Sequence, residues 1–159
     1  MADDERPAVV AFDGSDAAGA AVRAAASLLT GRHLLIVSVW EPGLAFAIAP
    51  MHDISGAAYM APSPDQVAAI DRVQRDHAVD VAEAGAQLAR EAGATAEPVA
   101  VSDEVDVTET IVGVAEQRDA CALVVGSRGL GGVKAMFGST SRSLLGQTDR
   151  PVLVVKARE

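Results

Sequence analysis

One stretch of the chain, Ala120 to Ser143, restricts the fold more than any other, because an apolar run passes there into a glycine-rich segment and then a hydroxyl-rich one. Cys121 to Val125 is short and apolar, which is typical of a strand buried on both faces of a parallel sheet. Glycine lets a backbone approach an anion, and a helix N-terminus offers unpaired N–H groups. The order therefore predicts a strand, a phosphate-binding loop and a helix. Its glycines are Gly126, Gly129, Gly131, Gly132 and Gly138.

The familiar phosphate-loop patterns do not fit this segment. The spacing GxxxxGK[ST] is absent, because Lys134 is not followed by a hydroxyl residue. The dinucleotide pattern GxGxxG does not match either. What remains is Gly126-x-x-Gly129, eight further residues, and then Gly138-Ser139.

Charge and composition narrow the classes of partner. The formal net charge is −9 over 159 residues, whereas nucleic acids and anionic membranes bind basic surfaces, so neither is expected as a partner. The chain has no apolar run of membrane-spanning length, and its first residues are acidic where a secretory signal is basic. The single cysteine, Cys121, agrees with a reducing compartment, and we expect a buried, unreactive thiol. The composition predicts a cytoplasmic protein of one domain over residues 1–159, with a charged tail at 1–6.

Apolar runs and helical patterns alternate along the whole chain, which is typical of a doubly wound parallel sheet. Ser15 and Asp16 are suited to cap the first helix. The expected strands are Ala8–Phe12, His33–Trp40, Ala94–Val101, Cys121–Val125 and Val152–Val155. The expected helices run from Asp16 to about Leu29, from Asp65 to near Gly93, over Val107–Gln117 and over Ser139–Leu145.

Two segments carry further signals. Pro98 interrupts the third strand, which favours an edge position because proline cannot donate to a neighbouring strand. The segment from Glu41 to Pro64 holds four prolines and two glycines and has no steady period, so we expect a long connection that serves as a lid or a partner-binding surface. In the longest helix, three- and four-residue steps predict a buried stripe of Val67, Ile70, Val73, His77, Val81, Ala84 and Leu88.

Right-handed crossovers leave few topologies for five such strands, and we predict the order 3-2-1-4-5. In that order the first and fourth strands are neighbours at the point where the connections reverse direction. Asp13, at the end of the first strand, and the loop after Gly126 then open at the same crevice. Open α/β sheets bind ligands there, so two motifs far apart in sequence predict one site.

These residues resemble the ATP-binding subgroup of the universal stress protein family. The similarity rests on the opening VVAFDGSD, the glycine pattern and the closing DRPVLVV, and it covers nearly the whole chain apart from residues 41–64. It implies a flavodoxin/Rossmann-like, adenine nucleotide alpha hydrolase-like fold. The gap between Gly129 and Gly138 is one residue shorter than in the family pattern.

The resemblance also implies roles for individual residues. A magnesium ion would accompany ATP, held by phosphate oxygens and not by a metal site of the protein. Arg128 on the loop would add positive charge. Adenine would contact Asp13 and Val39; the ribose and first phosphate would contact Val125, Gly126 and Gly129; the outer phosphates would contact Gly138, Ser139 and Thr140.

Family members resembling this one pair their last strands antiparallel to form dimers. Val152–Val155 is apolar and uncharged, as expected for an edge strand that pairs with a second copy. The alternative is a monomer whose edge is protected by Lys156 and Arg158.

Three functional classes fit the sequence. The first is an ATP-binding regulator of a stress response, whose output is a conformational or partner change. The second is an enzyme with at most slow ATP hydrolysis, because no general base or transition-state arginine is visible and the HxGH and SGGxDS motifs of adenylyl transfer are absent. The third acts through protein contacts alone. The largely intact glycine pattern favours the first class, and ATP, ADP and cyclic AMP all fit it.

Overall fold

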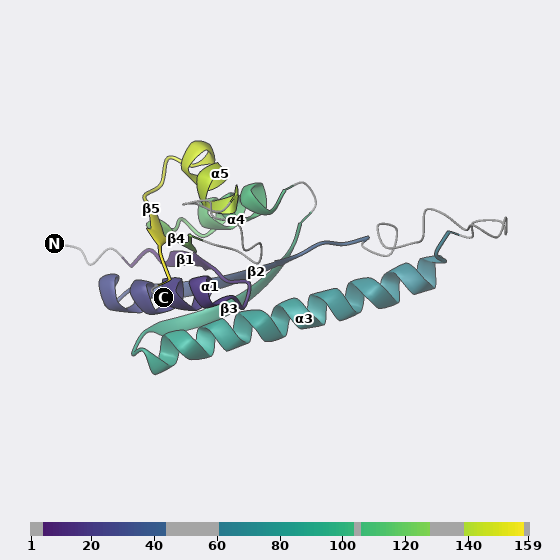
Figure 1. Ribbon diagram of the computed structural model, residues 1–159, viewed down its shortest axis with the longest axis horizontal. Coiled ribbons are helices and arrows are strands. Elements are labelled where there is room, and N and C mark those ends of the chain that lie inside the picture. Colours follow the sequence, from purple (N-terminus) through teal and green to yellow (C-terminus); the bar gives the residue numbers. More distant parts are fainter. Residues whose placement is uncertain (1–4, 44–60, 104–105, 128–138, 158–159) are drawn as a thin grey trace.

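The computed structural model describes residues 5–43, 61–103, 106–127 and 139–157 (Figure 1). They form a five-stranded parallel sheet in the order β3-β2-β1-β4-β5, which confirms the predicted doubly wound topology. The strands are β1 Ala8–Ala11, β2 His33–Trp40, β3 Thr95–Ser102, β4 Ala122–Gly126 and β5 Val152–Val155. The helices are α1 Asp16–Leu28, α3 Pro64–Glu91, α4 Val107–Gln117 and α5 Ser139–Gln147.

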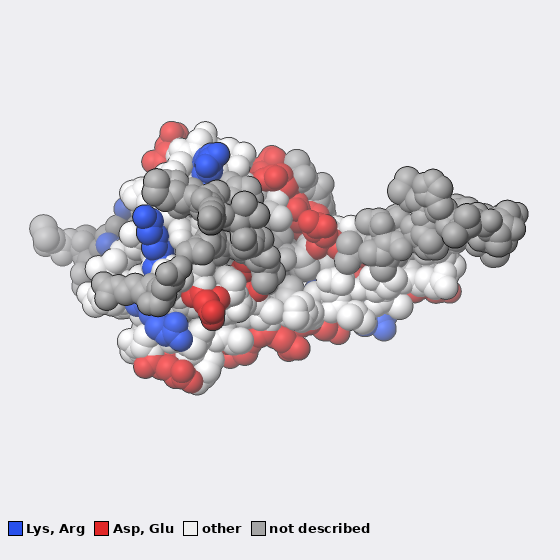
Figure 2. Space-filling view, viewed as in Figure 1, with Lys and Arg blue, Asp and Glu red and all other residues white. Residues whose placement is uncertain are grey.

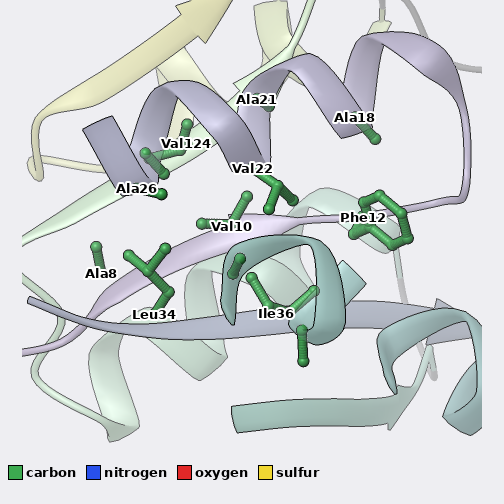
Figure 3. Close-up of a cluster of buried hydrophobic side chains, with 13 residues drawn as sticks. Ala8, Val10, Phe12, Ala18, Ala21, Val22, Ala26, Leu34, Ile36 and Val124 are labelled. Carbon is green, nitrogen blue, oxygen red and sulfur yellow. The ribbon is translucent and has the colours of Figure 1, made fainter. Parts of the chain in front are cut away.

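Helices cover both faces of the sheet (Figure 1). Alternating strand residues point to opposite faces and belong to two separate hydrophobic cores. On one face, α1 and α3 pack against even-numbered residues of β1 and β2. On the other, α4 and α5 pack against the odd-numbered residues. Figure 3 shows the first core, in which Val22 and the alanines of α1 lie over Val10 and Val124. Small side chains let α1 approach the sheet closely, as an interior poor in aromatic residues requires.

The buried stripe predicted for α3 is wrong in part. His77 and Ala84 are exposed, and Val73 is 65% exposed. The four other members of the stripe are half-buried, and only two of them, Val81 and Leu88, pack against the core. The buried residues begin fourteen positions into the helix and are Ala78, Ala82, Gly85, Ala86 and Ala89. A Cβ built on Gly85 would lie 2.7 Å from both Ile36 Cγ2 and Phe12 Cδ1, so the contact demands the smallest residues and not the most apolar ones.

Helix ends follow the expected chemistry. Ser15 caps α1, because its Oγ accepts from the N–H of Ala18 at 3.2 Å. Ser63 and Gln66 form a reciprocal capping box at the start of α3. Helix α5 continues through Gly146 to Gln147, two residues beyond its predicted end.

The predictions made for Pro98 and for Cys121 have different outcomes. Strand β3 lies at an edge of the sheet, as Pro98 predicts. Cys121 precedes β4 and is half-buried against the core of α1 and α3, so it lies at the margin of the core and not inside the strand as predicted; its N–H donates to the carbonyl oxygen of Pro7 at 2.8 Å. None of the described helices combines the length and apolar character needed to cross a membrane.

Candidate functional site

The connections of the sheet reverse direction between β1 and β4. From β1 the chain passes through α1 to β2 on one side, and from β4 it passes through α5 to β5 on the other. The two strands pair in parallel, with Ala8 opposite Ala122 and Val10 opposite Val124. Their carboxyl ends therefore lie side by side, as the sequence predicts, and this is the edge where open α/β sheets bind ligands.

Asp13 occupies the turn that leaves β1. Its Oδ1 accepts from the N–H of Ser15 at 2.9 Å, and Gly14 between them has a φ of +81°, a conformation that glycine adopts without strain. The Asp13 side chain is exposed, and its Oδ2 has no hydrogen-bond partner among the described residues. The turn thus fixes a carboxylate at the edge of the sheet while leaving one oxygen available.

Gly126, at the end of β4, touches the first turn of α1. A Cβ at this position would lie 2.6 Å from the carbonyl carbon of Ala17 and 2.7 Å from its oxygen. Only glycine lets the end of β4 approach the start of α1 so closely. The next residue, Ser127, is buried, and its N–H donates to the carbonyl oxygen of Val155 at 2.7 Å, which joins the exit of β4 to the end of β5.

Val39 and Val125 both belong to the α4 and α5 face of the sheet. Val125 is buried, whereas Val39 is half-buried. Strand β1 stops at Ala11, opposite Val37, so Val39 lies two residues further along β2 than the point where β1 ends. The short β1 therefore has a longer neighbour on its β2 side, with Val39 beside the turn that carries Asp13.

The remaining predicted site residues lie mostly outside the described part of the chain. Arg128, Gly129 and Gly138 are not described, and neither is the side chain of Ser139, the first residue of α5. Thr140 follows in the first turn of α5 and is half-buried. The structure thus brings together the ends of β1, β2 and β4, and it places α5 after the loop.

Acidic residues gather where β1, β2 and β3 end. Asp106 caps α4 by accepting from the N–H groups of Thr108 at 2.8 Å and Glu109 at 3.3 Å. The backbone hydrogen bond from Thr108, with smaller contributions from the Thr108 side chain and Glu109, lowers the pKa of Asp106 below its usual range. Within the described ranges, no three His, Cys, Asp or Glu side chains are grouped to hold a metal ion. The acidic residues at these ends are Asp13, Asp16, Glu41, Asp103 and Asp106.

A polar hollow of about 400 Å³ lies at the opposite edge of the sheet, between the C-terminal ends of α4 and α5. Arg150 has a structural role there, because its guanidinium donates to Asp119 Oδ1 and to the carbonyl oxygen of Ala120. No predicted site residue contributes to this hollow. Its lining residues are Glu116, Gly146, Gln147, Thr148, Asp149 and Arg150.

One cation, considered from the sequence only as protection for the edge of β5, lies at the edge that carries Asp13 and Gly126. Lys156 follows Val155, whose carbonyl oxygen binds Ser127 as described above, and it is exposed. The sequence did contain the signal, since a residue that directly follows a parallel strand must lie at the same edge as the other carboxyl ends.

Known proteins give the family context for this geometry. The model of the universal stress protein family matches residues 5–156. No curated protein sequence matches the chain.

Solved structures resemble the fold over nearly its full length. The universal stress protein from Archaeoglobus fulgidus is 24% identical, with 96% of this chain and 99% of that chain covered and a TM-score of 0.67. A universal stress protein in complex with cAMP is 22% identical, with 98% and 100% covered and a TM-score of 0.66. An Arabidopsis thaliana member of the family, with AMP bound, is 17% identical, with 96% and 92% covered and a TM-score of 0.57.

Proposed function

The chain belongs to the universal stress protein family, and from that premise we propose that it binds an adenine nucleotide at the carboxyl ends of β1 and β4. One observation carries the proposal: the exposed carboxylate of Asp13 and the glycine that opens the β4 loop share one edge at the reversal of the sheet. The cAMP and AMP in two of the similar structures support the class of ligand.

We assign the adenine to the end of β1, beside Asp13 and Val39. The free Oδ2 of Asp13 can accept from the exocyclic amine of adenine, and the half-buried valine offers an apolar wall to the ring. Val125 and Gly126, with Gly129, would line the ribose and first phosphate, and Arg128, Gly138, Ser139 and Thr140 would receive the outer phosphates.

Among adenine nucleotides we propose ATP with Mg²⁺ as the ligand, and a regulatory output through a conformational or partner change. The hydroxyls at the start of α5 and the helix dipole favour negative charge there. A cytoplasmic location fits the single cysteine.

The direct test is to denature the purified protein, identify any released small molecule by mass spectrometry, and titrate the stripped protein calorimetrically with ATP, ADP and cyclic AMP. The proposal predicts one adenine nucleotide per chain. No released ligand and no binding heat with any of the three would contradict it and would favour a role through protein contacts alone.

Variants of Asp13 locate the site. Asp13→Ala removes the carboxylate and should weaken nucleotide binding about tenfold or more, in line with a lost charged hydrogen bond. Asp13→Asn keeps the acceptor for Ser15 and so separates the turn from the ligand contact. Asp16→Asn is the matched control, because it removes an equal charge three residues away in the first turn of α1. Equal effects at both positions would mean that only the local charge matters.

We also propose that two copies pair through β5. The backbone groups of Pro151 and Val155 bond to β4, so alternation in a parallel ladder turns those of Val152 and Val154 outward. Val154→Pro removes an outward N–H without removing a bond to β4, and should convert a dimer to a monomer in analytical ultracentrifugation. A wild-type monomer would contradict the pairing.

A further inference from the structure

The residue that follows β5 lies at the edge proposed for the nucleotide. The carbonyl oxygen of Val155 accepts from the N–H of Ser127, so the β4–β5 ladder extends to the last residue of β5. Ser127 is the first residue after β4. Lys156, the residue that follows Val155, is therefore beside the point where the chain enters the loop between β4 and α5. Its side chain is exposed.

Alternation along β5 indicates the face that Lys156 occupies. Val152 and Val154 pack in the core of α4 and α5, whereas Leu153 and Val155 pack in the core of α1. The next position in this alternation is on the α5 face. Because β4 and β5 are parallel, the connection between them returns from the carboxyl ends, and α5 begins at Ser139 nearest to that edge.

The charge around this edge is unequal on its two sides. Acidic side chains lie at the ends of β1, β2 and β3, and the whole chain carries −9. In Figure 2 most Lys and Arg atoms lie over α1, β5 and α5, with some on α3, while most Asp and Glu atoms follow α3 and the ends of β3 and α4, with some over α1. The exposed basic residues in and directly after α1, β5 and α5 are Arg23, Lys156 and Arg142.

We propose that Lys156 is a specificity-determining residue of the nucleotide site, which binds the outer phosphates and makes the site prefer ATP and ADP to AMP. This inference rests on the proposed function. A nucleotide whose adenine lies at the end of β1 extends its phosphates toward β4 and β5, where Lys156 supplies an ammonium group. A charge-assisted hydrogen bond of this kind offsets the repulsion between ATP and an acidic protein.

The effect should appear mainly with the longer phosphate chains. The single phosphate of AMP, assigned to Gly126, lies level with Val155, one residue before Lys156, so Lys156 interacts with it less than with phosphates that extend beyond the strand ends. ATP and ADP carry the additional phosphates that reach it. An ammonium contact that is partly exposed to solvent changes affinity by roughly tenfold.

The experiment compares three variants by calorimetric titration with AMP, ADP and ATP. Lys156→Gln removes the positive charge and keeps a polar side chain, whereas Lys156→Arg keeps the positive charge. Arg23→Gln is the matched control, because it removes one exposed cation from the middle of α1, on the other face of the sheet. We expect Lys156→Gln to weaken ATP binding about tenfold and AMP binding less than twofold. Lys156→Arg should retain the ATP affinity of the wild type, and Arg23→Gln should bind all three nucleotides like the wild type.

The outcomes separate this inference from the function on which it rests. If the wild type binds none of the three nucleotides, the proposed function fails. If the wild type binds and Lys156→Gln loses ATP and AMP affinity equally, or loses neither, the assignment of Lys156 alone is overturned. Ultracentrifugation of Lys156→Gln completes the test, because a changed association state accompanying the weaker ATP binding would assign the lysine to the edge contact instead.

Discussion

Each half of the sheet meets a glycine that admits no side chain, Gly85 of α3 in one half and Gly126 of β4 in the other, but the neighbours of the two glycines differ. In the β2–β3 half, a Cβ on Gly85 would meet side-chain atoms of Phe12 and Ile36. At β4, a Cβ on Gly126 would meet the backbone of Ala17. Side chains change rotamer and a helix backbone does not, so the first contact belongs to packing that can adjust and the second fixes the geometry of a turn.

The two halves of the sheet also differ in the length of their strands and in the residues packed against them. Strands β2 and β3 are eight residues long and are covered by α3, whose buried face consists of alanine and glycine. Strands β4 and β5 have five and four residues, and the connection between them begins with a glycine next to α1. The long half supplies a stable platform, while the short half supplies the rigid turn at which we place the ligand.

Gly126→Ala should have the largest effect and tests the contrast directly. The added Cβ would lie 2.6 Å from the carbonyl carbon of Ala17, so α1 or β4 must move. We expect a loss of about 3 kcal/mol in the free energy of unfolding, and a fall in Tm of roughly 10 °C, measured by circular dichroism. Nucleotide binding should fall with it, so this variant cannot by itself locate the site. A Tm within a degree of the wild type would show that the turn is not rigid.

Gly85→Ala should cost less, although its closest contact is nearly as short. Ile36 and Phe12 can shift, and alanine gains up to about 1 kcal/mol of helix propensity over glycine. We expect a net loss of about 1 kcal/mol in urea unfolding, with nucleotide affinity unchanged. If Gly85→Ala destabilised the protein more than Gly126→Ala, the distinction between adjustable and fixed contacts would be wrong.

These two glycines also mark how far the sequence could predict the structure. The order of elements, the reversal between β1 and β4 and the edge position of β3 all follow from local patterns, because β-branched runs, helix caps and Pro98 act through neighbouring residues. The buried face of α3 did not follow, since the close approach at Gly85 depends on Phe12 and Ile36, far away in sequence. Periodicity favours large apolar residues and therefore selects Val73 and His77, which the structure exposes.

In the candidate site too, some features could be predicted from the sequence and others could not. Topology alone predicts that the turn at Asp13 and the end of β4 meet, and the structure brings their strands together. The contact between Gly126 and Ala17 has no signal in the sequence, because it joins a strand end to a helix that precedes it by more than a hundred residues. The phosphate contacts expected of Arg128, Gly129 and Gly138 lie outside the described residues and stay predictions.

The ion pairs at the opposite edge of the sheet provide a third comparison. In the β4–β5 half, the side chain of Arg150 is 24% exposed and donates to the carbonyl oxygen of Ala120 as well as to Asp119 Oδ1 at 3.3 Å. Arg150→Met keeps the apolar stem and removes these donors. Because the lost bond to a backbone carbonyl is partly buried, we expect about 1 kcal/mol of destabilisation in urea unfolding. Asp119→Asn, which removes the charge of the exposed ion pair and keeps a side chain that suits the φ of +45° at this position, is the control and should cost less; equal costs would assign the whole effect to the ion pair.

In the β2–β3 half, Glu97 accepts from Arg118 at 2.9 Å, and His33 Nε2 lies 3.6 Å from the same oxygen. The hydrogen bond from Arg118 is the largest cause that lowers the pKa of Glu97 below its ordinary value of 4.5; burial is the next largest and opposes it, and the charge of Arg118 and the hydrogen bond and charge of His33 assist it.

A carboxyl group whose pKa is lower in the folded state stabilises the protein above its ordinary pKa, and this contribution is lost as the pH falls through the folded value. Glu97→Gln should therefore be less stable than the wild type at pH 7, by about 0.5 kcal/mol because the side chain is 43% exposed and solvent screens the pair. The difference should shrink as the pH falls below 4.5, as urea unfolding of both proteins at pH 7, 5 and 3 will show. A difference that stays constant over this range would mean that the glutamine changes packing and not charge, so that the ion pair of Glu97 would not contribute to stability through its charge.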